Sequence, residues 1–332
     1  MIITQTPYRL SLAGGGTDLP AHYRVHGGAA VNLALDSFFY ISICRRLLPS
    51  FRIAYSRTEN VARPQDIAHD ITRAAFTRLG VTSPVEVTMT GEAPARTGLG
   101  SSSAVAVGLL HALAAMRGSA PAPEELAEQA CTLELDWLRR DMGRQDQYGC
   151  AVGGAKLLRF HCDDKVTVQR LSVPSETCAD LKRHALLLYL GQREPGSAIL
   201  SRQSAESPAK AAILNEMTAQ AVQMAALLER GSPASEIASL LHDGWQLKKS
   251  LCSEISSDNI DQVYERAIAH GALGGKLLGA GGAGFLFLIA PPERHETLVE
   301  ALGRPPRLRF GISEHGTRVV FHEAPFVGEP AS

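Results

Sequence analysis

One stretch decides how this chain folds: Gly91-Glu-Ala-Pro-Ala-Arg-Thr-Gly-Leu-Gly-Ser-Ser-Ser-Ala104. It follows a strand-like run, residues 85–90, and leads into a run over 105–116 whose apolar side chains recur at helical spacing. A glycine–serine loop before a helix exposes backbone N–H groups, and the helix dipole adds a partial positive charge. The stretch therefore predicts an anion-binding loop. The alternative is a well-capped core helix after a glycine turn.

The loop is not a P-loop, because no Gly-Lys-Ser/Thr sequence ends it. Instead, Pro94-x-x-x-Gly98-Leu-Gly-Ser-Ser-Ser-Ala104 resembles the second motif of the GHMP kinases, in which this loop wraps the phosphates of ATP. The resemblance implies that ATP is bound. The residues expected to bind it are Pro94, Gly98, Leu99, Gly100, Ser101, Ser102, Ser103 and Ala104.

The bulk composition is that of an ordinary globular protein. Its 332 residues favour two domains, and 45% hydrophobic and 20% charged residues are typical of soluble proteins. A net charge of −1 argues against a nucleic-acid surface, and no apolar run approaches the roughly 20 residues of a membrane span. The N-terminus lacks signal-peptide features, and the six cysteines and eleven histidines form no zinc pattern. We expect free thiols and a cytoplasmic location.

The first half alternates strand-like and helix-like runs. Strands are predicted over 2–13, 29–35, 38–45, 51–55, 85–90, 155–160 and 166–171, with Asp36-Ser37 as a hairpin turn. Helices are predicted over 64–79, 105–116 and 123–140. The polar segment 172–180 contains a proline, so we place the domain boundary there.

The second half predicts strands over 184–190 and 285–290, near 307 and over 317–322, and helices over 209–230, 234–250, 259–270 and 292–302. Gly279-x-Gly281-x-x-Gly284 matches the dinucleotide fingerprint as a pattern. A strand-like run follows it, however, where that fingerprint requires a helix. We expect these glycines to let the turn press against the anion-binding loop of residues 91–104, called the phosphate loop below. The turn also resembles the third GHMP motif.

The resemblance covers nearly the whole chain and implies an α+β, two-domain GHMP kinase fold. The N-terminal domain, residues 1–172, is expected to contain a left-handed β-α-β unit, an exception to the usual handedness. The C-terminal domain, residues 173–332, is expected to be ferredoxin-like. ATP and the acceptor are expected to bind in the cleft between the two.

Arg9 stands within an apolar strand. A buried arginine needs a partner, and a phosphoryl group can bind a guanidinium bidentately, although a structural carboxylate is the alternative. The run from Pro7 to Asp18 resembles the first GHMP motif, which implies a catalytic role for Arg9 beside the transferred phosphoryl. The implied acceptor-binding residues are Gly14, Gly15, Gly16, Thr17 and Asp18. For Asp18, the alternative is a helix N-cap.

Galactokinases carry an acidic residue and a histidine where Gly15 and Gly16 stand in this sequence. The glycines remove two side chains and leave room. This departure suggests an acceptor that is bulkier or held differently.

Glu134 lies beside the apolar stripe of the predicted helix 123–140. A carboxylate there is unusual unless it is paired or bound to metal. Mg²⁺ prefers a few oxygen ligands, and Ser102 with Glu134 supplies a hydroxyl and a carboxylate. The GHMP pattern assigns these two positions to metal. The alternative for Glu134 is an exposed pair with neighbouring arginines.

Asp146 stands in the polar, glycine-bounded stretch 143–149, which we read as a loop. Catalytic groups concentrate on such loops. The spacing from Glu134 fits the galactokinase-like branch of the family, where this aspartate accepts the acceptor's hydroxyl proton or assists its removal. An Asx-type turn stabiliser is the alternative.

Two strings resemble the D-glycero-D-manno-heptose 7-phosphate kinases within that family: Gly143-Arg-Gln-Asp-Gln-Tyr148 and Tyr189-Leu-Gly-Gln-Arg193-x-x-x-Ser197-Ala-Ile-Leu-x-x-Gln203. Those enzymes phosphorylate the anomeric 1-hydroxyl to give a 1,7-bisphosphate, a step that feeds nucleotide-sugar synthesis. Further substrate-binding residues implied here are Gln147, Arg193 and Gly281. A phosphorylated acceptor also requires basic residues at the far end of the pocket. The candidates are Arg193, Arg144, Arg202 and Lys276.

The expected partner is thus a small sugar phosphate, with neither nucleic acid nor membrane, for a monomer or homodimer. Three alternatives stay open: a kinase of a free sugar such as fucose, a non-catalytic sugar sensor on the same fold, and a decarboxylase of the mevalonate diphosphate type. The joint presence of Arg9, Glu134 and Asp146 speaks against the sensor.

Overall fold

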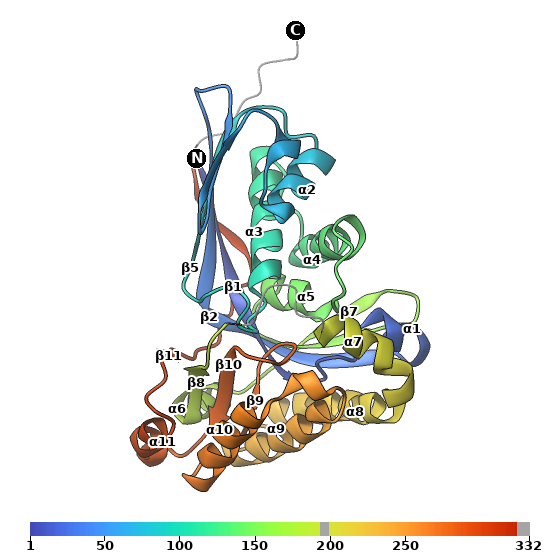
Figure 1. The fold of residues 1–332 in the computed structure, drawn as a ribbon, viewed down its shortest axis with the longest axis vertical. Coiled ribbons are helices and arrows are strands. Elements are labelled where there is room, and N and C mark those ends of the chain that lie inside the picture. Colours follow the sequence, from blue (N-terminus) through green and yellow to red (C-terminus); the bar gives the residue numbers. More distant parts are fainter. Residues whose placement is uncertain (193–198, 324–332) are drawn as a thin grey trace.

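The computed structural model describes residues 1–192 and 199–323, which form two sheets and their covering helices (Figure 1). The first sheet has eight strands in the order β12-β1-β2-β5-β3-β4, with β6 paired to β2 and β7 paired to β6. The strands are β1 (Ile2–Ala13), β2 (Gly28–Arg45), β3 (Phe51–Ala54), β4 (Thr58–Val61), β5 (Val85–Gly91), β6 (Ala155–Phe160), β7 (Val166–Arg170) and β12 (Arg318–His322). Mixed sheets and helices confirm the α+β class.

β2 is one continuous strand, so the hairpin predicted at Asp36-Ser37 is wrong. Residues 28–33 of β2 pair with β6, residues 39–45 pair with β5, and β1 runs alongside both halves. Asp36 donates its backbone N–H to Gly311 O at 2.8 Å. A change of partners along one long strand, rather than a turn, accounts for the break in the apolar pattern.

One face of the first sheet carries helices in two layers. α3 (Ser101–Met116) lies along β1 and β2, and α2 (Asp70–Arg78) and α4 (Pro123–Cys131) pack outside it (Figure 1). The other helical segments of this half are α1 (Pro20–His26), η1 (Pro64–Asp66), a π-helical segment η2 (Thr132–Trp137) and α5 (Gln145–Ala151). β3 and β5 pair in parallel, and α2 lies between them in the sequence. The left-handed crossover of this unit stays a prediction.

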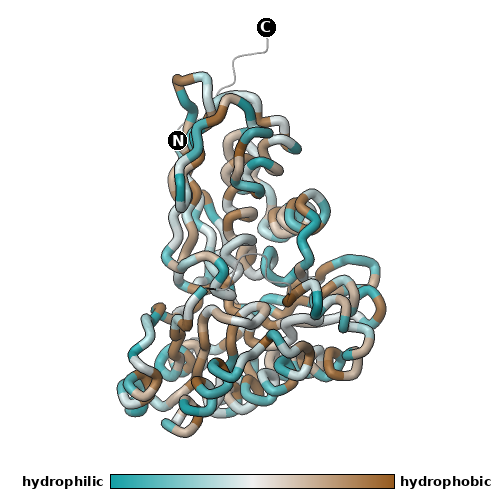
Figure 2. Tube along the Cα trace, viewed as in Figure 1, coloured by the Kyte–Doolittle hydropathy of each residue, from teal (hydrophilic) through white to brown (hydrophobic). Residues whose placement is uncertain are grey.

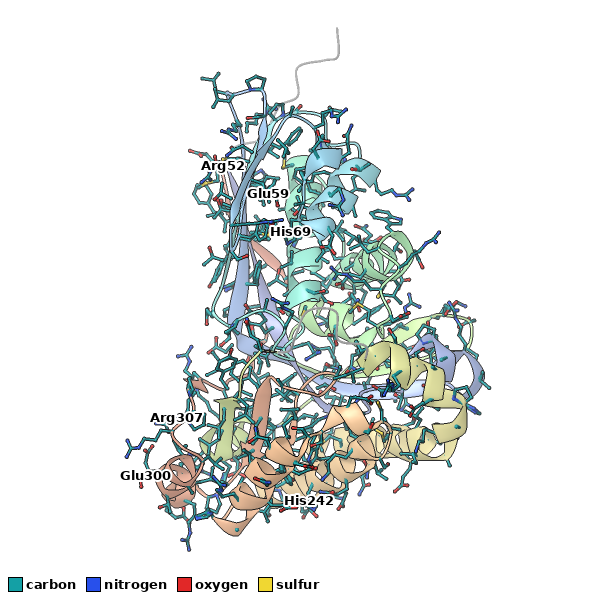
Figure 3. The ribbon with its side chains drawn as sticks, in the orientation of Figure 1. Arg52, Glu59, His69, His242, Glu300 and Arg307 are labelled. Atoms are coloured by element: carbon teal, nitrogen blue, oxygen red, sulfur yellow. The ribbon has the colours of Figure 1, made fainter. Side chains whose placement is uncertain are left out.

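α2 begins at Asp70, so the first half of the helix predicted over 64–79 is wrong. The carboxylate of Glu59 accepts the backbone N–H groups of Ala68 (2.5 Å) and His69 (3.0 Å) (Figure 3). The His69 ring then accepts the N–H of Thr72 at 3.3 Å, which caps the helix. These side-chain bonds take the backbone groups that an earlier helix start would need.

The second sheet is antiparallel, in the order β11-β8-β10-β9. Its strands are β8 (Ala185–Tyr189), β9 (Gly274–Leu277), β10 (Phe285–Ile289) and β11 (Arg307–Leu308). Numbered within this half, the order is 4-1-3-2 with helices after the first and third strands, which confirms the ferredoxin-like arrangement. β9 falls in the glycine-rich turn and was not predicted.

The helical segments of the second half are α6 (Ser175–His184), α7 (Ile199–Glu206), η3 (Ser207–Lys210), α8 (Ala211–Glu229), α9 (Ala234–Lys249), η4 (Ser253–Ile255), α10 (Asp258–Ala269), η5 (Pro292–Arg294) and α11 (His295–Ala301). α6 occupies most of the polar segment that we read as a domain boundary. The division at residues 172 and 173 stays a prediction, and the last strand, β12, returns to pair with β1.

Apolar packing joins the two halves. α8 packs on β2, and Leu33 and Leu35 of β2 share one buried cluster with Met224 of α8 and Phe287 of β10. In Figure 2, hydrophobic residues gather where the helices in the lower half of the view, including α8 and α9, meet the strands. This packing holds α9 and the turn after β9 against the end of β1. Within the described ranges, every helix is too short or too polar to cross a bilayer.

Candidate active site

A cavity of about 610 Å³ lies where the end of β1 and the starts of α3 and α5 face α9 and the turn after β9. The sequence-predicted residues that line it are Arg9, Gly15, Gly16, Asp18, Gly98, Gly100, Ser101, Ser102, Asp146 and Lys276. Residues from all three predicted motifs therefore share one cavity.

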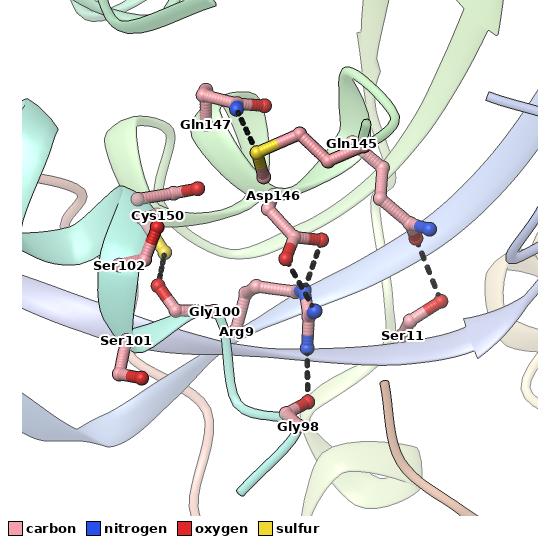
Figure 4. Close-up of polar contacts among 12 residues, drawn as sticks. Arg9, Ser11, Gly98, Gly100, Ser101, Ser102, Gln145, Asp146, Gln147 and Cys150 are labelled. Carbon is pink, nitrogen blue, oxygen red and sulfur yellow. Dashed lines mark hydrogen bonds and ion pairs between the residues drawn. The ribbon is translucent and has the colours of Figure 1, made fainter. Parts of the chain in front are cut away.

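Arg9 and Asp146 form a bidentate ion pair at one end of this cavity (Figure 4). Arg9 Nε and Nη2 donate to the two Asp146 carboxylate oxygens at 2.8 and 2.7 Å, and Nη1 donates to Gly98 O at 2.5 Å. Arg9 is 3% exposed and Asp146 is 21% exposed, so Asp146 reaches further toward solvent. The carboxylate that pairs with Arg9 is thus the predicted catalytic one. The pair links β1, α5 and the phosphate loop.

Asp146 lies in the first turn of α5, so the loop predicted over 143–149 is wrong. The glycines that suggested a loop have another use. Gly143 presses against the Asp18 carboxylate, and a Cβ on Gly149 would stand 2.9 Å from the Cβ of Arg9. A short helix can lie this close to β1 only where it lacks a side chain.

The phosphate loop leads directly into α3, which begins at Ser101. Gly100 adopts φ +73° before it, and no side chain caps the helix. First-turn N–H groups without an intrahelical partner are the usual means of binding a phosphate. Ser101 and Ser102 of this turn line the cavity, whereas Leu99, Ser103 and Ala104 are buried beneath it. Pro94 lies earlier in the loop, where its carbonyl accepts the Thr97 hydroxyl at 2.8 Å.

The third glycine motif presses on this loop, as predicted from the sequence. Phe285 N donates to Thr97 O at 3.0 Å, and a Cβ on Gly279 would stand 2.6 Å from Gly98 Cα. Gly98 itself, at φ +85°, faces the Leu278 carbonyl with no room for a side chain. The two loops therefore hold each other in place.

Because of this contact, we expect Gly98→Ala to weaken ATP binding by about 5- to 150-fold, the effect of about 1–3 kcal/mol of overpacking. Gly80→Ala is the matched control, since Gly80 has φ +64° but nothing within 4 Å of its added Cβ. Nucleotide titration by calorimetry measures both. Equal affinities in the two variants would mean that the Gly98 contact does not shape the nucleotide site.

Glu134 lies on the π-helical segment η2, where the helix predicted over 123–140 departs from α geometry. π-Helical turns often occur at functional sites. The side chain is 0% exposed and accepts hydrogen bonds from Ser102 Oγ, Ser103 Oγ (2.6 Å), Arg140 Nη1 (2.8 Å) and Gln147 Nε2 (2.8 Å). Burial raises the pKa of the Glu134 carboxyl, and the serine hydrogen bonds oppose that rise.

The oxygens around Glu134 fit a small hard cation. Ser102 Oγ and a Glu134 oxygen contact each other, and the Arg140 guanidinium touches both, at 2.7 and 2.8 Å. A positive charge is therefore already accommodated at this point. Among residues 1–192 and 199–323, no three His, Cys, Asp or Glu side chains group as metal ligands. Mg²⁺ here would thus depend on one carboxylate, one hydroxyl and phosphate oxygens, a set it commonly uses.

The first glycine motif forms another wall of the cavity. Gly14, at φ +80°, packs against Ala29 O, and Thr17 Oγ1 donates to Gly14 O and Ala29 O, both at 2.8 Å. These two residues shape the turn, while Gly15, Gly16 and Asp18 face the cavity. Burial and the nearby Asp146 charge raise the pKa of Asp18, which accepts the Gly16 N–H at 2.9 Å.

Gln145, rather than the predicted Gln147, lines the cavity. It receives the Ser11 hydroxyl at 2.8 Å and donates to Asp18 Oδ1 at 3.0 Å. Gln147 is fully buried and holds Glu134, because residues two apart on a helix face different ways. Gly281 packs on Ile255, and the cavity instead meets Gly279 and Ala280.

The basic residues considered as partners for an acceptor phosphate differ in their contacts and in whether they line the cavity. Arg193 lies outside the described residues. Arg144 is bound to Glu128 and to the Asp164 carbonyl, and Arg202 is paired with Glu254. Lys276 lines the cavity.

Lys248 also lines the cavity, and sequence reasoning missed it. Its position on the buried stripe of α9, after Leu241 and Trp245, could have revealed it. Other lining residues not predicted are Ser11, Leu19, Arg96, Arg140, Asp141, Met142, Leu200 and Ser201.

Two family models match the chain. The model for the GHMP kinases N terminal domain matches residues 66–154, and the model for the GHMP kinases C terminal matches residues 224–307. Together they cover just over half of the 332 residues.

Similar proteins include sugar kinases and mevalonate kinases. The chain is 25% identical to a D-glycero-alpha-D-manno-heptose 7-phosphate kinase from Campylobacter jejuni, over 91% of this chain and 93% of that protein. It is 28% identical to an L-fucokinase/L-fucose-1-P guanylyltransferase from Bacteroides fragilis, over 95% of this chain but 38% of that protein. A D-glycero-D-manno-heptose 1-phosphate kinase from Bacteroides thetaiotaomicron has the same fold, with a TM-score of 0.79 at 23% identity over 98% of this chain and 100% of that one.

Proposed function

The chain belongs to the GHMP kinases, which makes it an ATP-dependent phosphotransferase with an alcohol acceptor, and from that premise we propose that the acceptor is a heptose 7-phosphate. The product is the 1,7-bisphosphate, formed on the anomeric 1-hydroxyl. The chain has the two-domain α+β fold of the family and is a sugar kinase. We propose the particular sugar, the hydroxyl that is phosphorylated and a domain division between residues 172 and 173.

The observation that carries the proposal is the position of the Arg9–Asp146 pair between two glycine loops. One loop leads into the uncapped start of α3, and the other ends at Asp18. A donor phosphate held at α3 and a hydroxyl held near Asp18 meet beside the Asp146 carboxylate. Such positioning and electrostatics supply most of the acceleration in phosphoryl transfer.

In the proposed reaction the acceptor oxygen attacks the γ-phosphorus of ATP, and the bond between that phosphorus and the oxygen shared with ADP breaks. Asp146 accepts or orients the hydroxyl proton, and Arg9 fixes the Asp146 carboxylate and adds positive charge beside the transferred group. Ser101 and Ser102 line the phosphate end of the cavity, while Asp18 and the turn over residues 14–16 position the sugar. Ser102 and Glu134 would hold a Mg²⁺ ion, which would supply charge neutralisation on the phosphate oxygens.

A kinase of a free sugar is the second candidate, because the fucokinase similarity extends over 95% of this chain. ADP release measured against a panel of free hexoses, free heptoses and their terminal phosphates separates the two. We expect kcat/KM for a heptose 7-phosphate to exceed that for the same unphosphorylated heptose by at least about 10-fold, the contribution of charge-assisted hydrogen bonds. A preference for free fucose or galactose would select the second candidate. ATP binding without turnover of any sugar would select the sensor.

A further inference from the structure

Two lysines face the cavity without an acidic partner. Lys248 on α9 is 4% exposed, and its Nζ donates to Gly15 O at 2.9 Å and lies 3.5 Å from Gln203 Oε1. Lys276 on β9 is 7% exposed, and its Nζ donates to Leu12 O at 3.3 Å. Neither ammonium group has an Asp or Glu within ion-pair distance in the described parts of the chain. Buried cations that bond only to neutral oxygens are costly to keep.

The positive charges repel one another. Burial lowers the pKa of Lys248 to about 8, although the charges of Asp18 and Asp146 oppose that change. Burial lowers the pKa of Lys276 to about 7, and the nearby charges of Lys248 and Arg9 lower it further. An anion between the two ammonium groups would offset both the repulsion and the loss of hydration.

A third donor points to the same place. The Gln203 side chain is 2% exposed, and its Nε2 has no hydrogen-bond partner among the described residues. This nitrogen lies against Gly16, in the space that a side chain at that position would fill, with Lys248 Nζ beside it. An unpartnered buried N–H group normally indicates a missing acceptor. Lys248 and Lys276 thus offer two charged donors at the cavity lining, and Gln203 offers a third donor beside Lys248, behind Gly16.

The two lysines belong to the wall of the cavity formed by the end of β1 and the first glycine turn, which we call the acceptor wall, and Gln203 lies behind this wall beside Lys248. Lys248 donates to the Gly15 carbonyl in the glycine turn, and Lys276 donates to the Leu12 carbonyl at the end of β1. Two other cations that line the cavity lie at the phosphate loop: Arg140 Nη1 donates to Ser102 Oγ at 2.7 Å, and Arg96 donates its backbone N–H to Ser101 Oγ at 3.3 Å. Arg9, in contrast, is near enough to both lysines to lower their pKa values. An anion held by the lysines would therefore be carried by the acceptor rather than by the nucleotide.

We propose that Lys248, Lys276 and Gln203 form the subsite for the phosphate that the acceptor already carries. The proposal rests on the proposed function and names the residues that give it its specificity. It also explains the glycine at position 16, since a side chain there would displace Gln203. Phosphate oxygens accept hydrogen bonds from all three donors, and two ammonium groups match the charge of a phosphate dianion.

The test compares Lys248→Met, Lys276→Met and Gln203→Leu with the wild-type enzyme on a heptose 7-phosphate and on the same heptose without phosphate. Each lysine variant is expected to lower the kcat/KM ratio of the two acceptors by about 10- to 100-fold, the effect of one hydrogen bond to a charged group. Gln203→Leu is expected to lower it less, by about 5-fold. The KM for ATP is expected to stay within about 2-fold of wild type in all three variants, because the lysines face the acceptor wall.

Lys156→Met is the matched control. Lys156 is also fully buried and donates only to the carbonyls of Gly149 (3.0 Å) and Val152 (2.5 Å), but it does not line the cavity. Its loss is expected to lower the melting temperature and leave the acceptor ratio unchanged. Any variant that does not fold is replaced by its glutamine counterpart, Lys248→Gln or Lys276→Gln.

The possible outcomes distinguish a failure of the proposed subsite from a failure of the proposed function. If wild type prefers the unphosphorylated heptose, the proposed function fails. If wild type prefers the phosphate but the lysine variants keep that preference, only the subsite is overturned. A rise in the KM for ATP with an unchanged acceptor ratio would instead assign the lysines to the nucleotide phosphates. An equal loss on both acceptors would show that they are structural.

Discussion

Asp146→Asn is expected to lower kcat by at least about 10²-fold, the low end for the loss of a positioned acid or base group. Asparagine keeps the size of the side chain, but it cannot accept the hydroxyl proton and it leaves Arg9 without a charge partner. The KM for ATP is expected to change little, because Asp146 acts on the acceptor. Steady-state assays at saturating ATP and acceptor measure the effect.

The control for this variant is Asp164→Asn. Asp164 also binds an arginine through both oxygens, with Arg24 Nε at 2.8 Å and Nη2 at 3.2 Å, but it lies outside the cavity. We expect its kcat to stay within a few-fold of wild type. An Asp146→Asn enzyme that remains as active as this control would exclude Asp146 from the chemistry, and an equal loss in both would point to general destabilisation.

Glu134→Gln is expected to raise the Mg²⁺ concentration for half activity by at least about 10-fold, comparable to the loss of a residue that supports a metal ligand. The amide is a weaker metal ligand than the carboxylate. Its NH₂ group would also face donors from Ser103, Arg140 or Gln147, which now all bond to the carboxylate. Calorimetric titration of Mg²⁺ into enzyme saturated with a non-hydrolysable ATP analogue gives the same comparison without turnover.

Glu128→Gln serves as the comparison for Glu134. Glu128 also pairs with an arginine, Arg144, and accepts the Tyr148 hydroxyl at 2.6 Å, but it does not line the cavity. Its magnesium titration is expected to match that of wild type. The ligand assignment does not survive if Glu134→Gln gives the same titration as wild type in both measurements.

The strand, loop and helix around residues 91–104 could be predicted because the information is local. Residues 85–90 alternate, the glycines and serines mark the turn, and residues 105–116 repeat at helical spacing. These local signals need no knowledge of distant residues. The packing of the glycines over 279–284 on the phosphate loop joins residues far apart in the sequence, and it was expected together with the resemblance to the third GHMP motif.

What could not be predicted depends on tertiary contacts. The bond of Glu59 to His69 delays the start of α2, and the alignment of β2 with several partner strands removes the turn at Asp36. Apolar periodicity does not distinguish an α-helix from the π-helical turn that carries Glu134. The burial of Lys248 could be inferred from the apolar stripe of α9, but the cavity that it faces depends on the packing of α8 and α9 against the first half of the chain.

Phosphorus NMR of the product made from a heptose 7-phosphate shows whether this enzyme moves a phosphoryl group from ATP to the anomeric hydroxyl of a sugar that already bears a phosphate. We expect one new phosphate ester resonance, split by the single anomeric proton, beside the unchanged signal of the 7-phosphate. Release of ADP with only inorganic phosphate, or an ester on another carbon, would contradict it.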